Sequence, residues 1–140
     1  MFTVTITPRF GDADTLGHIN NVSLALWFEL ARNPLFDIFV SREKIPSREN
    51  FPLILVHTDY DFVAQMYLRA DTEIKTWIEK IGNKSFTIYH EAWQSGRLCA
   101  KGRAVIVYYN FGEEKSAPLP DGKKKLLSEH MLPPDREFSL

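Results

Sequence analysis

The segment Phe10–Arg32 constrains the fold of this chain more than any other, because a short polar loop leads there into an almost wholly apolar run. From Val22 to Ala31 the run places leucine, tryptophan and phenylalanine on nearly every side of a helix. A helix of this composition is typical of a protein core, since it has no polar face to turn toward water. The pattern therefore predicts a core helix that the rest of the chain must cover.

The loop before the helix gathers several groups capable of chemistry: Gly11, Asp12, Asp14, Gly17, His18, Asn20 and Asn21. Glycine permits tight turns, and asparagine is a preferred N-cap, so Asn20 or Asn21 is expected to open the helix. The first N–H groups of a helix lack acceptors within it, and the helix dipole adds positive charge there. A carbonyl oxygen that gains negative charge would be stabilised at this end, and a neighbouring carboxylate could act on the same carbonyl as nucleophile or general base.

An antiparallel sheet is predicted from the rest of the chain. The expected strands cover Thr3–Phe10, Phe51–Phe62, Thr72–Ile81, Ser85–Gln94 and Leu98–Phe111. Short turns at 82–84 and 95–96 favour an antiparallel meander of the last three strands. One apolar helix beside such a sheet indicates an α+β fold in which the sheet wraps the helix.

The remaining segments are predicted to connect or end these elements. Pro34 should break or kink the helix. The polar stretch Ser41–Asn50 should be a loop, Gly112–Pro120 should leave the sheet, and Asp121–Met131 should form a short helix. The tail, from about 132 to 140, is expected to be frayed, and a length of 140 residues favours one domain over 1–140.

Composition excludes several classes of partner. With a formal net charge of −1, the chain gives no reason to expect a nucleic acid or a membrane surface as partner. The single cysteine, Cys99, excludes an internal disulfide, suits a reducing compartment and is expected only to pack. No apolar run approaches the roughly 20 residues of a spanning helix, and Met1–Phe10 does not read as a signal peptide. We therefore expect a cytoplasmic protein.

The residues around Gly17 resemble the signature of the hotdog-fold acyl-CoA thioesterases of the 4-hydroxybenzoyl-CoA thioesterase type. In that family a first strand ends in an aromatic residue and D-x-D, followed by two residues, a glycine and the central helix. One large branch reads G-H-x-N-N, and this chain reads the same from Gly17 to Asn21. The family's glutamate and arginine, twelve and fifteen residues after the glycine, correspond to Glu29 and Arg32. Leu24 departs from the pattern, because a tyrosine is usual there.

The resemblance implies a hotdog fold, in which an antiparallel five-stranded sheet wraps one long central helix, and it implies a thioester hydrolase. It assigns the catalytic carboxylate to Asp14, the second acid of D-x-D, and the oxyanion donor to the backbone N–H of Asn21. In related hotdog enzymes the catalytic carboxylate lies on the helix, which makes Glu29 the rival acid. The alternative for Glu29 is an i,i+3 pair with Arg32, and we favour this alternative.

Two other side chains of the loop are expected to support it rather than to react. Asp12 should hold loop N–H groups. His18 has no second histidine at ligand spacing, so we expect no metal and instead expect His18 to hydrogen-bond within the loop and shape the site. No redox cofactor is implied either.

Contacts to coenzyme A are predicted from the second hairpin. The phosphates of coenzyme A attract lysine, and Lys80 and Lys84 flank the turn at 82–84. The family places basic CoA-contacting residues at this hairpin, where Ser85 begins its common S-F pair. The predicted substrate contacts are therefore Gly17, Lys80, Lys84 and Ser85, although exposed hairpin lysines can also serve solubility alone.

The sequence as a whole predicts an acyl-CoA thioesterase that releases the free acid and CoA. Two alternatives stay open: a thioesterase acting on an acyl-carrier protein, and a non-catalytic hotdog protein that binds acyl-CoA. A single sheet around one helix leaves an edge open, and hotdog proteins pair two protomers edge to edge with sites between them. We therefore expect a homodimer or a homotetramer.

Overall fold

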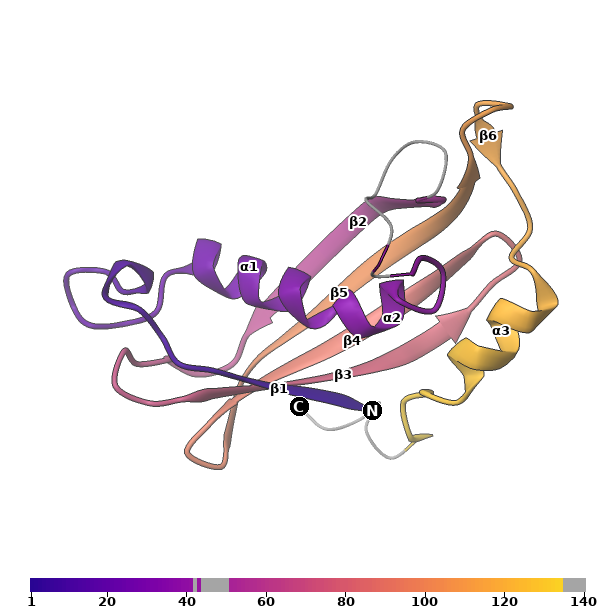
Figure 1. Ribbon diagram of the computed structural model, residues 1–140. Helices are drawn as coiled ribbons and strands as arrows, with labels where there is room; N and C mark the ends of the chain where they lie inside the picture. Colours follow the sequence, from indigo (N-terminus) through magenta and orange to yellow (C-terminus); the bar gives the residue numbers. More distant parts are fainter. Residues whose placement is uncertain (42, 44–50, 135–140) are drawn as a thin grey trace.

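The computed structural model describes residues 1–41, 43 and 51–134 (Figure 1). Its elements, in chain order, are β1 (Phe2–Ile6), η1 (Phe10–Asp12), α1 (Asn21–Ala31), α2 (Asn33–Phe36), β2 (Leu53–Phe62), β3 (Thr72–Ile81), β4 (Ser85–Gln94), β5 (Arg97–Asn110), β6 (Lys115–Ser116) and α3 (Asp121–Ser128). The five long strands lie in the order β1-β3-β4-β5-β2, every neighbouring pair is antiparallel, and the sheet curves around α1 (Figure 1). The α+β prediction is therefore confirmed, as is the β3-β4-β5 meander.

The first strand is shorter than predicted, because it ends at Ile6 instead of Phe10. Pro8 has no backbone N–H to continue a ladder, and the chain then turns through η1, where Asp12 N–H donates to the Arg9 carbonyl (2.8 Å). Phe10 is left 90 % exposed. Of the two predicted caps, Asn20 opens α1, and its Oδ1 accepts the Ser23 N–H at 2.8 Å.

Pro34 interrupts the helical segment as predicted, since α1 ends at Ala31 and α2 begins at Asn33 with the proline in its first turn. The predicted loop Ser41–Asn50 lies almost entirely outside the described residues. The stretch expected to leave the sheet does not do so completely, because the two residues of β6 pair back onto Tyr109 and Asn110.

The C-terminal helix is also shorter than predicted and ends at Ser128. Leu132, where fraying was expected to begin, is only 8 % exposed. Its N–H donates to the Ile78 carbonyl at 2.7 Å. The chain after α3 therefore runs beside β3 and forms a parallel bridge between Met131 and Ile78. The Ile78 N–H in turn donates to the His130 carbonyl at 2.8 Å, so two backbone bonds and the buried Leu132 side chain connect this segment to the sheet.

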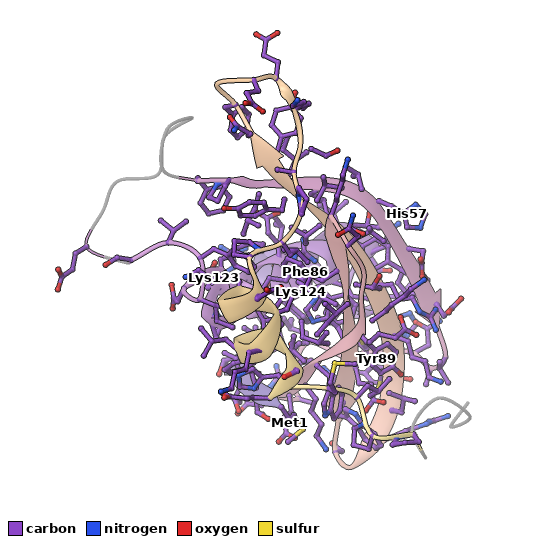
Figure 2. All side chains as sticks on the ribbon, turned by 90° about the vertical axis from the view of Figure 1, so that its right-hand side faces the viewer. Met1, His57, Phe86, Tyr89, Lys123 and Lys124 are labelled. Carbon is purple, nitrogen blue, oxygen red and sulfur yellow. The ribbon has the colours of Figure 1, made fainter. Side chains whose placement is uncertain are left out.

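The buried apolar residues of the described chain form three clusters, of which the smallest is Trp77, Tyr89 and Leu132 and the two larger ones pack α1, α2 and α3 against the sheet. The first joins α1 to the sheet: Leu24, Trp27, Phe28, Ala31, Met66, Ile74, Ala92, Cys99 and Ala100. The second lies toward α2 and α3 and includes Leu35, Ile78, Phe86, Ile88 and Leu127. Figure 2 shows Phe86 on the inner side of the sheet behind α3, whereas His57 projects from the outer side.

One contact fixes how closely α1 approaches the sheet. Gly102 of β5 lies between Tyr60 and His90 in the strand register. The Phe28 ring stacks on both neighbours, with centroids at 5.9 Å from Tyr60 and 4.8 Å from His90. A Cβ at position 102 would lie 2.6 Å from Phe28 Cε2, so only glycine permits this packing.

The outer face of α1 corrects one prediction. We expected the sheet to cover the whole helix, but Val22, Leu26 and Leu30 are 65 %, 52 % and 48 % exposed. The edge strand β2 also carries exposed apolar residues, including Leu55 and Val56. We call the set Val22, Leu26, Leu30, Leu55, Val56, Phe62 and Val63 the apolar strip. A single curved sheet cannot enclose a helix that is apolar on every side.

Candidate active site

The loop before α1 is a tight, backbone-bonded turn. Ala13 and Ile19 form an antiparallel bridge, and Asp14 N–H donates to the His18 carbonyl at 2.8 Å. Gly17 has a φ of +78°, a left-handed conformation that residues with a side chain rarely adopt. The glycine at this position is therefore required for the turn that carries Asp14.

Asp14 presents one bonded and one free carboxylate oxygen. Its Oδ1 accepts the N–H groups of Leu16 (2.9 Å) and His18 (3.1 Å), which fixes the side chain within the turn. Within the described part of the chain, Oδ2 has no hydrogen-bond donor, and the residue is exposed. This arrangement orients the carboxylate while leaving an oxygen able to attack a carbonyl or to accept a proton from water.

Asp12 confirms the expected supporting role. It is 1 % exposed, and it accepts hydrogen bonds from the Arg9 N–H (2.7 Å), the Arg9 guanidinium (3.2 and 3.3 Å) and the Ser23 hydroxyl (2.8 Å). Burial alone would raise the pKa of this carboxyl group, but the bonds from Arg9 and Ser23 outweigh burial and hold the pKa below its ordinary value. Asp12 thus ties the loop to the first turn of α1.

A pocket of about 500 Å³ lies beside the N-terminus of α1. Its lining residues are Ile19, Asn20, Asn21, Leu24, Phe62, Val63, Ala64, Gln65 and Met66. Asn21 and Val22 are the first residues of the helix, and in the described chain their N–H groups have no acceptor. Of these two residues Asn21 lines the pocket, which therefore lies beside an unpaired N–H donor and the positive end of a helix dipole.

The wall opposite the helix is held in place by backbone bonds. The N–H groups of Val63 and Ala64 both donate to the Cys99 carbonyl (2.8 and 3.0 Å), and Ile19 N–H donates to the Met66 carbonyl at 2.8 Å. These bonds connect the segment 62–66 both to β5 and to the loop before α1. The pocket is consequently formed by parts of one connected framework.

His18 supports this wall. Its backbone N–H bonds to Asp14, as expected of a residue that shapes the loop, while its ring contacts Tyr67 edge-on with centroids 5.3 Å apart. Tyr67 is itself fixed by Gln94, whose side-chain amide accepts from the Tyr67 N–H at 2.8 Å and donates to the Tyr67 carbonyl at 2.9 Å. In the part of the chain that the structure describes, no group of three or more potential ligands could hold a metal ion.

Glu29 and Arg32 do not form the expected ion pair. Glu29 is exposed, whereas Arg32 is 3 % exposed and directs Nη1 to His90 Nε2 at 3.5 Å. Burial lowers the pKa of Arg32, and burial together with the charge of Arg32 lowers the pKa of His90 to about 3. The His90 ring is therefore neutral, and its Nδ1 lies 2.9 Å from the Thr76 hydroxyl.

The predicted site residues fall into two groups. Asp14, Gly17, His18 and Asn21 lie together in the loop and the first turn of α1. Lys80, Lys84 and Ser85 lie at the β3–β4 hairpin, at the opposite end of the sheet (Figure 1). Within one protomer these groups are not brought together, and Asp14 is not a lining residue of the pocket.

Sequence reasoning missed the segment 62–66. It carries no chemical motif, and it reaches the pocket only through the strand pairing that brings the end of β2 beside β5.

Comparison with protein families gives a match over most of the chain. The model of the thioesterase-like superfamily matches residues 8–127, which include the loop, α1 and all the long strands except β1. A solved structure of a predicted thioesterase from Bacillus stearothermophilus is 41 % identical, covers 95 % of this chain and 98 % of that chain, and has a TM-score of 0.86.

Two more distant structures share the fold. A thioesterase from Thermus thermophilus, complexed with coenzyme A and Zn, is 24 % identical with a TM-score of 0.78 and covers 91 % of each chain. A 1,4-dihydroxy-2-naphthoyl-CoA thioesterase from Synechocystis is also 24 % identical with a TM-score of 0.78, and covers 91 % of this chain and 96 % of that chain. These similarities confirm the resemblance seen around Gly17: the chain belongs to the thioesterase-like superfamily, has the hotdog fold and is a thioester hydrolase.

Proposed function

We propose that this protein is an acyl-CoA thioesterase that uses Asp14 as its catalytic carboxylate. The observation that carries the proposal is the free, oriented oxygen of Asp14, held on a loop that leads within seven residues to the unpaired N–H groups of α1. An acyl-transfer site needs both parts, a nucleophile or base and donors for the oxyanion.

Two routes fit this arrangement. In the first, Asp14 Oδ2 bonds to the thioester carbon, the C–S bond breaks, CoA leaves as the thiol after taking up a proton, and water hydrolyses the resulting anhydride. In the second, Asp14 accepts a proton from the water that attacks the same carbon, the C–S bond then breaks, and CoA leaves as the thiol by taking up that proton from Asp14. In both, the Asn21 N–H and the helix dipole stabilise the negative oxygen of the tetrahedral intermediate.

The first experiment is a screen of acyl-CoA thioesters with detection of the released thiol. Hydrolysis of acyl-CoA supports the proposal. Turnover of an acyl-carrier-protein thioester alone would assign the protein to that second substrate class. Tight binding of acyl-CoA without any turnover would instead indicate the non-catalytic alternative.

No helix in the described chain is long and apolar enough to cross a membrane. A cytoplasmic location stays part of the proposal.

We further propose that a second copy of the chain covers the apolar strip. Exposed apolar residues on both α1 and the β2 edge support this, because long open edges are usually paired or covered. The outcome would be a homodimer or a homotetramer.

Sedimentation tests the assembly. We expect a species larger than the 16.2 kDa monomer at micromolar concentration. Leu26→Glu should dissociate it, because the change places a charge within the strip, whereas Leu126→Glu, at an exposed leucine of α3, should not. A wild-type monomer at micromolar concentration would contradict the proposal.

Lys84 remains a proposed phosphate contact, and so does Lys80 with less support. Because the hairpin lies far from the Asp14 loop of the same protomer, the contact would come from another subunit. Lys84→Ala should raise KM for acyl-CoA and leave kcat nearly unchanged, since the contact is equal in ground and transition states. The effect should shrink with salt, and Lys125→Ala, at an exposed lysine of α3, is the control. An unchanged KM at low ionic strength would refute the contact.

A further inference from the structure

We propose that Gln94, the last residue of β4, is a positioning residue for the Asp14 carboxylate. This inference rests on the proposed thioesterase function and adds a residue of the sheet that determines where the catalytic carboxylate lies. It is carried by a continuous series of hydrogen bonds that runs from the end of β4 to the loop before α1.

The Gln94 side chain is buried, and both of its polar atoms are bonded. It is 5 % exposed. Its Oε1 accepts the Tyr67 N–H at 2.8 Å, and its Nε2 donates to the Tyr67 carbonyl at 2.9 Å. The same Nε2 lies 3.1 Å from the Ala70 carbonyl oxygen and 3.0 Å from the Thr72 hydroxyl. One side-chain amide therefore holds both backbone groups of Tyr67, as a neighbouring strand would.

Tyr67 lies in the connection between β2 and β3, which covers residues 63–71 and continues neither strand. Backbone polar groups outside a strand ladder need other partners. Among the described residues, Gln94 is the one side chain that bonds to the backbone of this connection, at Tyr67 and at Ala70. Loss of the Gln94 amide would therefore detach the middle of the connection from β4.

The same connection holds the loop that carries Asp14. The Ile19 N–H donates to the Met66 carbonyl at 2.8 Å, and the Leu68 N–H donates to the Gly17 carbonyl at 3.1 Å. Among the described residues, the other backbone bonds of the loop 9–20 stay within the loop or lead into α1. The position of the loop relative to the sheet thus depends on the connection that Gln94 fixes.

His18 links Tyr67 to the carboxylate. His18 and Tyr67 form an antiparallel bridge, and their rings are in edge-on contact. The His18 N–H donates to Asp14 Oδ1 at 3.1 Å, and the His18 carbonyl accepts the Asp14 N–H at 2.8 Å. A shift of Tyr67 would therefore move the donor that orients Asp14. Misplacement of a reacting group by about 1 Å can cost about 100-fold in rate.

Gln94→Leu is the first test, because leucine fills a similar volume and forms no hydrogen bonds. We expect kcat toward acyl-CoA, per folded molecule, to fall by about 10- to 100-fold. Thr76→Val is the matched control, since the Thr76 hydroxyl is also buried but bonds to His90 instead of to the connection. This control should lower the urea midpoint of unfolding and leave kcat per folded molecule unchanged.

A double variant separates positioning from general stabilisation. If Gln94 acts through Asp14, Gln94→Leu should lower kcat by less than about twofold in the Asp14→Asn background, where no catalytic carboxylate remains to be misplaced. A residue that only stabilises the fold would lower the two rates by the same factor. Equal factors in both backgrounds would overturn the inference.

Amide hydrogen exchange tests the same connection without any substrate. In Gln94→Leu, the N–H groups of Ile19 and Leu68 should exchange at least about tenfold faster, relative to the amides of β4 and β5. Unchanged exchange at these two positions would show that the loop does not depend on Gln94, and the inference would be wrong. If Gln94→Leu does not fold, Gln94→Asn takes its place. Its amide is one methylene shorter, and the same changes are expected in both measurements.

The wild type and Asp14→Asn decide the proposed function separately. Failure of the wild type to hydrolyse any thioester, or full activity of Asp14→Asn, would overturn the proposed function whatever Gln94 does. A large loss of kcat in Asp14→Asn, together with wild-type kcat in folded Gln94→Leu, would overturn only the role of Gln94.

Discussion

Asp12 and Asp14 lie two residues apart in one loop, but the surroundings of their carboxylates differ. Asp12 is 1 % exposed and both of its oxygens accept hydrogen bonds from Arg9 or Ser23. Asp14 is exposed, and only its Oδ1 is bonded. Full pairing fixes a charge in place and removes its capacity to react. A carboxylate bonded through one oxygen keeps its orientation and an available lone pair, so the same residue type holds the structure at position 12 and fits the catalytic role that we propose for position 14.

The largest effect should follow from Asp14→Asn. The amide oxygen can still accept the N–H groups of Leu16 and His18, so the loop should remain folded. The amide neither attacks a carbonyl nor accepts a proton from water at neutral pH, so kcat should fall by roughly 10²–10⁴. Steady-state kinetics measure the loss of kcat, and urea unfolding of the same preparation shows whether the protein remains folded.

The opposite change, Asp12→Asn, should act on stability. Hydrogen bonds to a charged, buried group contribute about 1.5–3 kcal/mol, and an amide would turn its NH₂ toward donors of Arg9 or Ser23. We expect the free energy of unfolding to fall by about 2 kcal/mol, with kcat per folded molecule changed only a few-fold. A loss of turnover without a loss of stability at this position would remove the distinction between the two aspartates.

Acid should reduce the free energy of unfolding that the Asp12 carboxylate contributes, which gives a further test of the difference between Asp12 and Asp14. Its pKa is lower in the folded state than in the unfolded chain, where the ordinary value is 3.8, so the unfolded chain binds more protons as pH falls. The stabilisation is complete above the unfolded pKa and is lost as pH falls through the folded pKa, by at most about 1.4 kcal/mol per pH unit. The stability difference between wild type and Asp12→Asn should therefore shrink below about pH 4, when measured by urea unfolding across pH.

The smallest effect is expected from Glu29→Gln. This carboxylate is exposed on α1, and Arg32 contacts His90 instead of pairing with it. Stability should change by less than about 0.5 kcal/mol and kcat by less than about twofold. A large loss of kcat here, combined with a small loss in Asp14→Asn, would move the catalytic carboxylate onto the helix.

Local sequence patterns predicted the elements that depend on neighbouring residues. β3 and β4 have the predicted bounds, because apolar alternation and a short turn define them. Asn20 caps α1 and Asp12 holds the loop as predicted. Each does so through a hydrogen bond to a residue three positions away, Ser23 and Arg9 respectively. The motif around Gly17 also led to the correct superfamily.

The features that were missed depend on distant parts of the chain. Arg32 bonds to His90, 58 residues away, and no pattern near Arg32 distinguishes this contact from an ion pair with Glu29. The end of β2 enters the pocket only after the sheet has formed. The exposed face of α1 follows from the width of one curved sheet, which an apolar helical pattern does not encode.

The contact between Gly102 and Phe28 has a consequence for catalysis at a distance. Any side chain at position 102 would push the Phe28 ring, which is already confined between Tyr60 and His90, and would lift α1 from the sheet. A helix moves as a rigid rod, so the displacement would reach Asn21, about 10 Å away along its axis. The absence of a side chain at position 102 thus helps to set the position of the first turn of α1, where the proposed oxyanion donors lie.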